Sequence, residues 1–152
     1  MHISLREYLI HGKLGSFTVG MSVTEMLSAL GEPDAVSVPR RKTRKPQVYK
    51  YGDFEIFTLW DNLDVTCTIY LEYPLDREAL SFPAFTADIY WPIAQRCSRA
   101  TVEAYLWEES LAFEDCPERY GLKLTATDAL FTFENDWLGA ISTQAFKDLL
   151  RL

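Results

Sequence analysis

Carboxylates are the most plentiful reactive groups in this 152-residue chain, and several of them occur as close pairs. The pairs are Asp53/Glu55, Asp61/Asp64, Glu108/Glu109, Glu114/Asp115 and Glu134/Asp136. General acid–base catalysis would need one member of a pair to be buried with a raised pKa. Most of the pairs lie in turn-like segments, where Asp is favoured because its side chain hydrogen-bonds the nearby backbone. We therefore interpret these carboxylates as solvated turn residues rather than as catalytic dyads.

Nucleophilic catalysis needs a base beside a serine or cysteine, and the sequence offers few bases. The only histidines are His2 and His11, both near the N-terminus. A Cys97–His11 dyad is the open alternative, although no local motif supports it. Cys67 lies on the apolar face of a predicted strand, so we expect an inert core thiol. The sequence contains no metal-ligand spacing and no glycine-rich phosphate loop, so we predict no catalytic residues, no metal site and no cofactor.

The cysteines and the N-terminus indicate a compartment. The chain has three cysteines, which are widely spaced and fit neither a disulfide framework nor a zinc site. Such free thiols suit a reducing environment. The N-terminus carries an early acidic residue and no apolar core of a signal peptide, and no apolar run is long enough to cross a bilayer. We predict a cytoplasmic protein without a membrane segment.

The net charge of −7 conceals an uneven distribution. Residues 1–50 contain eight Lys or Arg against four Asp or Glu, whereas residues 51–152 contain seven against eighteen. The basic excess is concentrated in Arg40, Arg41, Lys42, Arg44 and Lys45. Basic clusters of this kind can contact nucleic acid, but the acidic remainder would repel it. We interpret the cluster as a solvated loop, able to pair with acidic residues of a partner or of a second copy.

Aromatic side chains make up 14% of the residues and include four tryptophans, which are first of all core candidates. They are Trp60, Trp91, Trp107 and Trp137. Two of the four lie at predicted strand ends among carboxylates, a composition typical of binding hot spots. The predicted partner-binding residues are therefore Asp53, Glu55, Trp60, Asp61, Asp64, Glu134, Asp136 and Trp137.

Local signals in the sequence predict both ends of a helix over residues 22–30. Ser22 and Glu25 have the spacing of a capping box. Gly31 is predicted to end the helix in a left-handed conformation, and Pro33 prevents its continuation. Apolar residues recur at helical spacing along one face, namely Val23, Met26, Leu27 and Leu30.

The order helix, loop and three strands occurs twice in the chain. Alternation and turn signals predict strands at 47–51, 54–60, 63–73, 122–125, 129–134 and 138–142. A second helix is capped by Ser98 or Thr101, and shorter helices are predicted at 4–9, from Pro92 and at 145–150. Ile56 matches Leu130 and Val48 matches Leu122 at a separation of 74 positions, and Val23 matches Val102 at 79.

These matches predict a duplicated unit, with chance similarity as the alternative. The units would be residues 1–73 and 91–152, joined by 74–90 within a single domain spanning 1–152. The predicted fold is α+β, with an antiparallel sheet built from two helix-plus-meander units and helices on one face.

The stretch Gly20-Met21-Ser22, with Leu30-Gly31-Glu32-Pro33 and Tyr49-Lys50-Tyr51-Gly52-Asp53, resembles two groups of proteins. One is a set of small bacterial proteins that look like the immunity partners of secreted toxins. The other is the helix-then-sheet repeat of beta-lactamase inhibitor protein and of outer-membrane assembly lipoproteins. The resemblance covers residues 20–71 clearly and 98–142 faintly. The second half lacks Leu-Gly-x-Pro, and a lipobox is missing, which argues against an envelope lipoprotein.

The resemblance implies a function by binding. We expect a non-enzymatic cytoplasmic immunity protein that occludes the active surface of a cognate toxin domain through acidic and aromatic residues, with neither nucleic acid nor membrane as its partner. The alternative is a regulatory or scaffold domain that self-associates, for instance as a homodimer.

Overall fold

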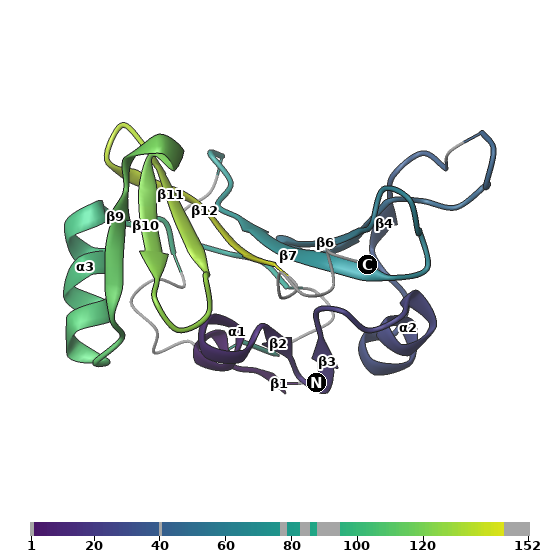
Figure 1. Cartoon of the computed structure of the whole chain (residues 1–152), viewed down its shortest axis with the longest axis horizontal. Helices are drawn as coiled ribbons and strands as arrows, with labels where there is room; N and C mark the ends of the chain where they lie inside the picture. Colours follow the sequence, from purple (N-terminus) through teal and green to yellow (C-terminus); the bar gives the residue numbers. More distant parts are fainter. Residues whose placement is uncertain (1, 40, 77–78, 83–85, 88–94, 145–152) are drawn as a thin grey trace.

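The computed structural model, which describes residues 2–39, 41–76, 79–82, 86–87 and 95–144, contains one large antiparallel sheet. The sheet has eight strands in the order β4-β5-β6-β7-β12-β11-β10-β9 (Figure 1). Its first half comprises β4 (Ala35–Val36), β5 (Val48–Tyr51), β6 (Phe54–Thr58) and β7 (Thr66–Glu72). Its second half comprises β9 (Phe113–Cys116), β10 (Gly121–Leu124), β11 (Leu130–Glu134) and β12 (Trp137–Gln144).

The helices complete an α+β fold, as predicted. They are α1 (Leu5–His11), α2 (Val23–Leu30), α3 (Arg99–Glu108) and the 3-10 turn η1 (Pro117–Arg119). Two small sheets pair β1 (His2–Ile3) with β8 (Thr86–Ala87), and β2 (Lys13–Leu14) with β3 (Phe17–Thr18). One core cluster contains buried residues of α1, α2, α3 and both halves of the sheet. The predicted helices at 145–150 and from Pro92 lie outside the described residues.

Local side-chain caps begin the three helices. The Ser22 hydroxyl accepts a hydrogen bond from the Glu25 N–H at 3.1 Å, and the Glu25 carboxylate accepts from the Ser22 N–H at 2.8 Å. The predicted capping box is therefore confirmed. Ser98, not Thr101, caps α3, and Ser4 caps α1.

The end of α2 differs from the prediction. Gly31 has φ 80° and ψ −164°, which is a positive-φ extended conformation and not the left-handed helical one. A side chain at this position would be strained, so glycine is still required. The extended backbone turns the Gly31 carbonyl to the Tyr51 hydroxyl, which donates to it at 2.8 Å.

Each half of the sheet has one more strand than the sequence predicted. β4 lies within residues 34–46, which were predicted to be a loop, and β9 follows α3 directly. Both extra strands are short and lie at the two edges of the sheet. Each unit is thus a helix followed by four strands, and the last strands of the two units, β7 and β12, pair antiparallel at the centre.

The two units make the same contacts at equivalent places. The first N–H of α2, on Val23, donates to the Asp64 carbonyl at 2.8 Å, and that of α3, on Arg99, donates to the Asp136 carbonyl at 2.9 Å. The cap residues form isolated bridges to the start of the last strand, Ser22 with Val65 and Ser98 with Trp137.

These contacts correct the predicted alignment of the two units. The helices align at 76 positions, Ser22 with Ser98, and not at 79. A register shift follows Phe57 in β6 and Thr132 in β11, so Ile56 corresponds to Phe131 and not to Leu130. The predicted separation of 74 is wrong by one residue. An alignment shifted by one residue would match residues on the core face of one unit with residues on the open face of the other.

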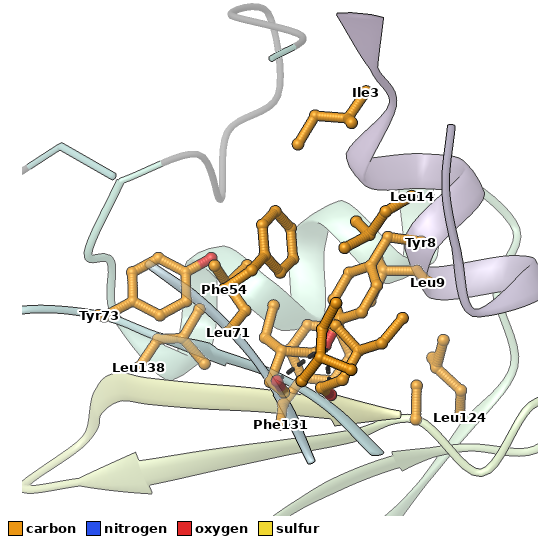
Figure 2. Packing of buried hydrophobic residues seen from close by; sticks show 14 of the residues in the cluster. Ile3, Tyr8, Leu9, Leu14, Phe54, Leu71, Tyr73, Leu124, Phe131 and Leu138 are labelled. Carbon is orange, nitrogen blue, oxygen red and sulfur yellow. Dashed lines mark hydrogen bonds between the residues drawn. The ribbon is translucent and has the colours of Figure 1, made fainter. Parts of the chain in front are cut away.

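The hydroxyl of Tyr8 lies at the junction of the two units. It is 3.1 Å from the Ile69 carbonyl of β7 and 2.9 Å from the Ile141 carbonyl of β12. Figure 2 shows the ring between α1 and the sheet, where it meets Phe54 edge-on at 5.2 Å between ring centres. Burial raises the pKa of the Tyr8 phenol far above its usual value, so the hydroxyl remains a donor.

Removal of this hydroxyl should weaken the whole fold. We expect Tyr8→Phe to lower the free energy of unfolding by about 1–3 kcal/mol, because two buried carbonyls lose a donor. Urea denaturation measures this loss. The control is Tyr120→Phe, since Tyr120 is 78% exposed and its change should stay within about 0.5 kcal/mol. Equal stability of the Tyr8 variant and the unmodified chain would contradict the assigned role.

Alkaline pH should destabilise the protein through its buried tyrosines. Burial raises the pKa of Tyr51 to about 12 and raises the pKa values of Tyr8 and Tyr73 far above the usual value of a tyrosine. The stability they confer is complete below about pH 10, the unfolded pKa, and is lost as the pH rises toward the folded values. The free energy of unfolding, measured by denaturation between about pH 9 and pH 11.5, should fall with pH in the unmodified chain. In Tyr8→Phe this fall should be less steep by up to about 1.4 kcal/mol per pH unit. Identical slopes would show that Tyr8 titrates normally.

Candidate partner-binding surface

The tryptophans of the described residues lie on the surface and not in the core. The side chains of Trp60, Trp107 and Trp137 are 69%, 77% and 47% exposed. The expectation of core packing is therefore wrong for Trp107, whereas Trp60 and Trp137 are exposed, as a binding role requires; Trp91 lies outside the described residues. A tryptophan supplies a large apolar area and one N–H donor, so exposed tryptophans are typical of binding surfaces.

Trp137 begins β12, directly after a tight hairpin turn. Asn135 and Asp136 have φ values of 50° and 67°, the two positive values that a type I′ turn requires. The turn pairs Trp137 with Glu134 of β11. Both side chains point away from the core, since the next pair, Leu138 with Phe133, is packed into it.

A hollow of about 220 Å³ adjoins this hairpin and is lined by residues of β7, β11 and β12 and of the segment after β7. Its lining includes the carboxylate-bearing Glu72 and Glu134 together with Tyr70 and Leu75. Leu75 is 79% exposed, so the rim offers apolar as well as acidic surface. Trp137 stands beside it, with the Arg96 guanidinium 5.5 Å from its ring centre. The hairpin and the hollow together form what we name the Trp137 surface: Tyr70, Glu72, Leu75, Glu134, Asp136 and Trp137.

Three residues of this surface, Tyr70, Glu72 and Leu75, were not among the predicted binding residues. Alternation along β7 could have placed Tyr70 and Glu72 on the open face, because Ile69 and Leu71 are core residues. The position of the β11–β12 hairpin beside these residues could not be anticipated, because it depends on the pairing of β7 with β12, which are far apart in the sequence.

Trp60 lies at the other end of the sheet. It belongs to the loop between β6 and β7, together with the exposed residues Asp61 and Asp64. The Asp64 carboxylate forms an ion pair with Lys45 at 2.6 Å, which neutralises part of the local charge. This end therefore presents an exposed indole with less negative charge than its sequence indicated.

The predicted binding residues do not form one continuous surface. β7 and β12 run antiparallel, and each begins at its own tryptophan-bearing turn. Trp60 and Trp137 consequently lie at opposite ends of the central strand pair. About ten residues of extended chain separate the two ends, which corresponds to roughly 30 Å.

Two predicted residues have structural contacts. Asp53 is only 6% exposed, and its carboxylate accepts the Ser81 N–H at 2.5 Å. Asp53 therefore holds the 79–82 segment against the β5–β6 turn and does not face a partner. Glu55 is half-buried on the open face and lies 3.5 Å from the Lys50 amine.

The thiols are poorly suited to nucleophilic chemistry. Burial raises the pKa of Cys97 to about 11, so the thiol is protonated at neutral pH. His11, the base considered for it, is an exposed residue at the end of α1 and lies 3.9 Å from Glu7. Cys67 is half-buried beside the register shift in β6–β7, so the prediction of a core position for it is wrong.

Comparison of the chain with protein-family models, with curated protein sequences and with solved structures finds no match. Within the described ranges, no group of three or more His, Cys, Asp or Glu side chains is arranged to hold a metal ion. In that part of the chain, every helix is too short or too polar to cross a membrane.

Substitution of the exposed tryptophans should leave the fold intact. We expect Trp60→Ala and Trp107→Ala each to change the free energy of unfolding by less than about 1 kcal/mol, as surface substitutions do. Leu138→Ala should cost about 2–5 kcal/mol, because Leu138 is fully buried. Chemical denaturation distinguishes the two classes. A tryptophan variant as unstable as Leu138→Ala would place that indole in the core.

Proposed function

We propose that this chain is a non-enzymatic, cytoplasmic immunity protein that binds a basic bacterial toxin domain and blocks its active surface. The observation that carries the proposal is the Trp137 surface, where an exposed indole stands beside a hollow bordered by Glu72 and Glu134. The motif resemblance around residues 20–53 supports the same class of protein.

The composition of the Trp137 surface favours a protein partner. Trp137 and Leu75 supply apolar area at its edge, and Tyr70 adds an aromatic ring inside the hollow. Burial of such groups against a partner provides most of the binding energy of typical interfaces. The hollow is too small and too open to enclose a drug-sized ligand, for which pockets usually measure about 300–1,000 Å³.

Charge gives the surface its selectivity. Glu72, Glu134 and Asp136 carry negative charge on a chain of net charge −7. A basic partner would be attracted over a distance of about 10 Å at moderate salt, which speeds association and disfavours acidic competitors. Toxin domains that attack nucleic acid need positive charge to hold phosphates, so they suit such a surface.

The properties of the cysteine and carboxylate side chains support a binding function more than a catalytic one. The raised pKa of Cys97 removes the thiolate that a nucleophilic mechanism requires. The carboxylates of the Trp137 surface lie at an exposed hairpin and strand end, where water reaches them. We accordingly assign them to recognition.

Co-expression with the product of the adjacent gene tests the proposal. We expect the two proteins to co-purify, and the chain to restore growth of cells that express the neighbour. Trp137→Ala should weaken binding by about 30-fold or more, the loss typical of a hot-spot residue. Trp107→Ala, which removes an equally large exposed indole elsewhere, should stay within about threefold of the unmodified chain. Failure to co-purify or to protect would contradict the proposed function.

The charge of the hairpin should act on the association rate. We expect Glu134→Lys to slow association at low salt and to have less effect at high salt, because screening removes the attraction. Stopped-flow or surface-based kinetics at two salt concentrations measures this. A rate that does not depend on salt in either protein would exclude the electrostatic part of the proposal.

A further inference from the structure

The two edges of the sheet carry opposite charge. β4 forms one edge, and residues 37–39 and 41–47, which follow it toward β5, project from the body as an arm (Figure 1). Between Val36 and Pro46 the sequence has five Lys or Arg and no Asp or Glu. β9 forms the other edge, and residues 100–118 around it have six Asp or Glu and no Lys or Arg.

The arm, which we name the basic arm, is held at its base and exposed along its length. The Ser37 hydroxyl accepts hydrogen bonds from the N–H groups of Gln47 and Val48 at 3.0 and 3.1 Å. Val38, immediately beyond this point, is 88% exposed. Arg41, Lys42 and Arg44 follow, all of them exposed, whereas Lys45 at the end of the arm pairs with Asp64. The basic arm therefore presents an apolar side chain and several cations that the body of the protein does not cover.

An apolar groove lies at the acidic edge, where α3 leads into β9. It has a volume of about 360 Å³ and is lined by Leu106, Trp107, Ser110, Leu111, Ala112 and Phe113. The Trp107 ring meets the Phe113 ring edge-on at 5.8 Å and stays 77% exposed. Glu108 and Glu109 follow Trp107 directly, and Glu114 follows Phe113. We name this site the Trp107 groove.

The basic arm and the Trp107 groove are complementary in chemistry. Val38 is an apolar side chain that suits an apolar groove, and the cations of the arm suit the carboxylate-rich segment around that groove. Arginine and lysine also bind the face of an exposed indole. Ion pairs from Arg6 to Glu109, from Arg99 to Glu103 and Asp115, and from Lys123 to Glu114 neutralise much of the acidic edge, so the attraction is weak.

The arm cannot reach the groove of its own chain. β4 and β9 are the first and last of eight strands, which at about 4.8 Å per strand places them roughly 34 Å apart. Because the arm leaves the sheet and returns to it, it can reach out by only half of its length. Half of the arm is about five residues, which extend about 16 Å. Contact between the two sites therefore requires two molecules.

We propose that the basic arm of one copy docks in the Trp107 groove of a second copy. The contact is heterologous, so each molecule keeps one arm and one groove available, and association proceeds head to tail into short chains or a closed ring. A contact made by one arm is small, which makes the association transient and sensitive to salt. This inference does not depend on the proposed toxin partner.

Sedimentation velocity of the full chain tests the contact. At about 50 mM salt the mean sedimentation coefficient should rise with protein concentration, and at about 500 mM salt this rise should vanish. Arg41→Glu/Lys42→Glu and Trp107→Ala should each weaken association at least about tenfold. Lys13→Glu, a charge reversal at an exposed residue of β2 away from both sites, should associate like the unmodified chain. Circular dichroism verifies that all variants are folded.

Mixing the two defective variants provides the decisive experiment. The Arg41→Glu/Lys42→Glu chain keeps an intact groove, and the Trp107→Ala chain keeps an intact arm. Each variant alone should sediment as a monomer, whereas the mixture should form a one-to-one heterodimer and nothing larger. A wild-type chain that is monomeric at every concentration at low salt, or variants that associate as it does, would overturn the proposal.

Discussion

One buried hydroxyl holds the two halves of this protein in register. The Tyr8 phenol, carried by the first helix, bonds the carbonyls of Ile69 and Ile141, which occupy equivalent positions in the two units. Half of an eight-stranded sheet would leave an unpaired central strand, so β7 and β12 need each other. Because a phenol in this environment stays neutral and must donate, it fixes α1 over the junction and completes the covered face.

The same arrangement determines what remains exposed. The helices and the core lie on one side of the sheet, so side chains on the other face and at the strand ends are left for contacts with other molecules. The antiparallel junction directs the two tryptophan-bearing turns to opposite ends, and the order of strands puts the basic arm and the acidic edge on opposite borders. The surface proposed for a basic partner and the two sites proposed for self-association therefore lie in different parts of the sheet.

Local signals in the sequence predicted much of the fold. Ser22 and Glu25 form the predicted capping box because such bonds join residues only three apart, and the predicted apolar faces of α2 and α3 are buried at Met26, Leu30 and Val102. The two-unit architecture was also visible in the order of elements. The predicted alignment of the units was wrong by one to three residues, because similar apolar residues fit more than one register. Only the hydrogen bonds between strands determine which face each residue occupies.

The binding surface was harder to predict. The sequence around Asp53 is typical of a solvated turn. Its carboxylate is nevertheless buried against the Ser81 N–H, a contact between segments that are distant in the sequence. Tryptophan has both apolar and polar character, so its sequence context did not separate core from surface. Glu72 joins Glu134 at one hollow only through the pairing of β7 with β12, which no local pattern encodes.

Backbone hydrogen exchange of the free protein, measured residue by residue, tests most directly whether the β7–β12 junction makes the two units one cooperative structure. We predict that the amides of Ile69–Leu71 and Ile141–Thr143 exchange most slowly. Core amides of both units should exchange through the same global unfolding, with the same dependence on denaturant. If the amides of one unit exchanged through an independent opening while the other unit stayed protected, the junction would not be the element on which the structure depends.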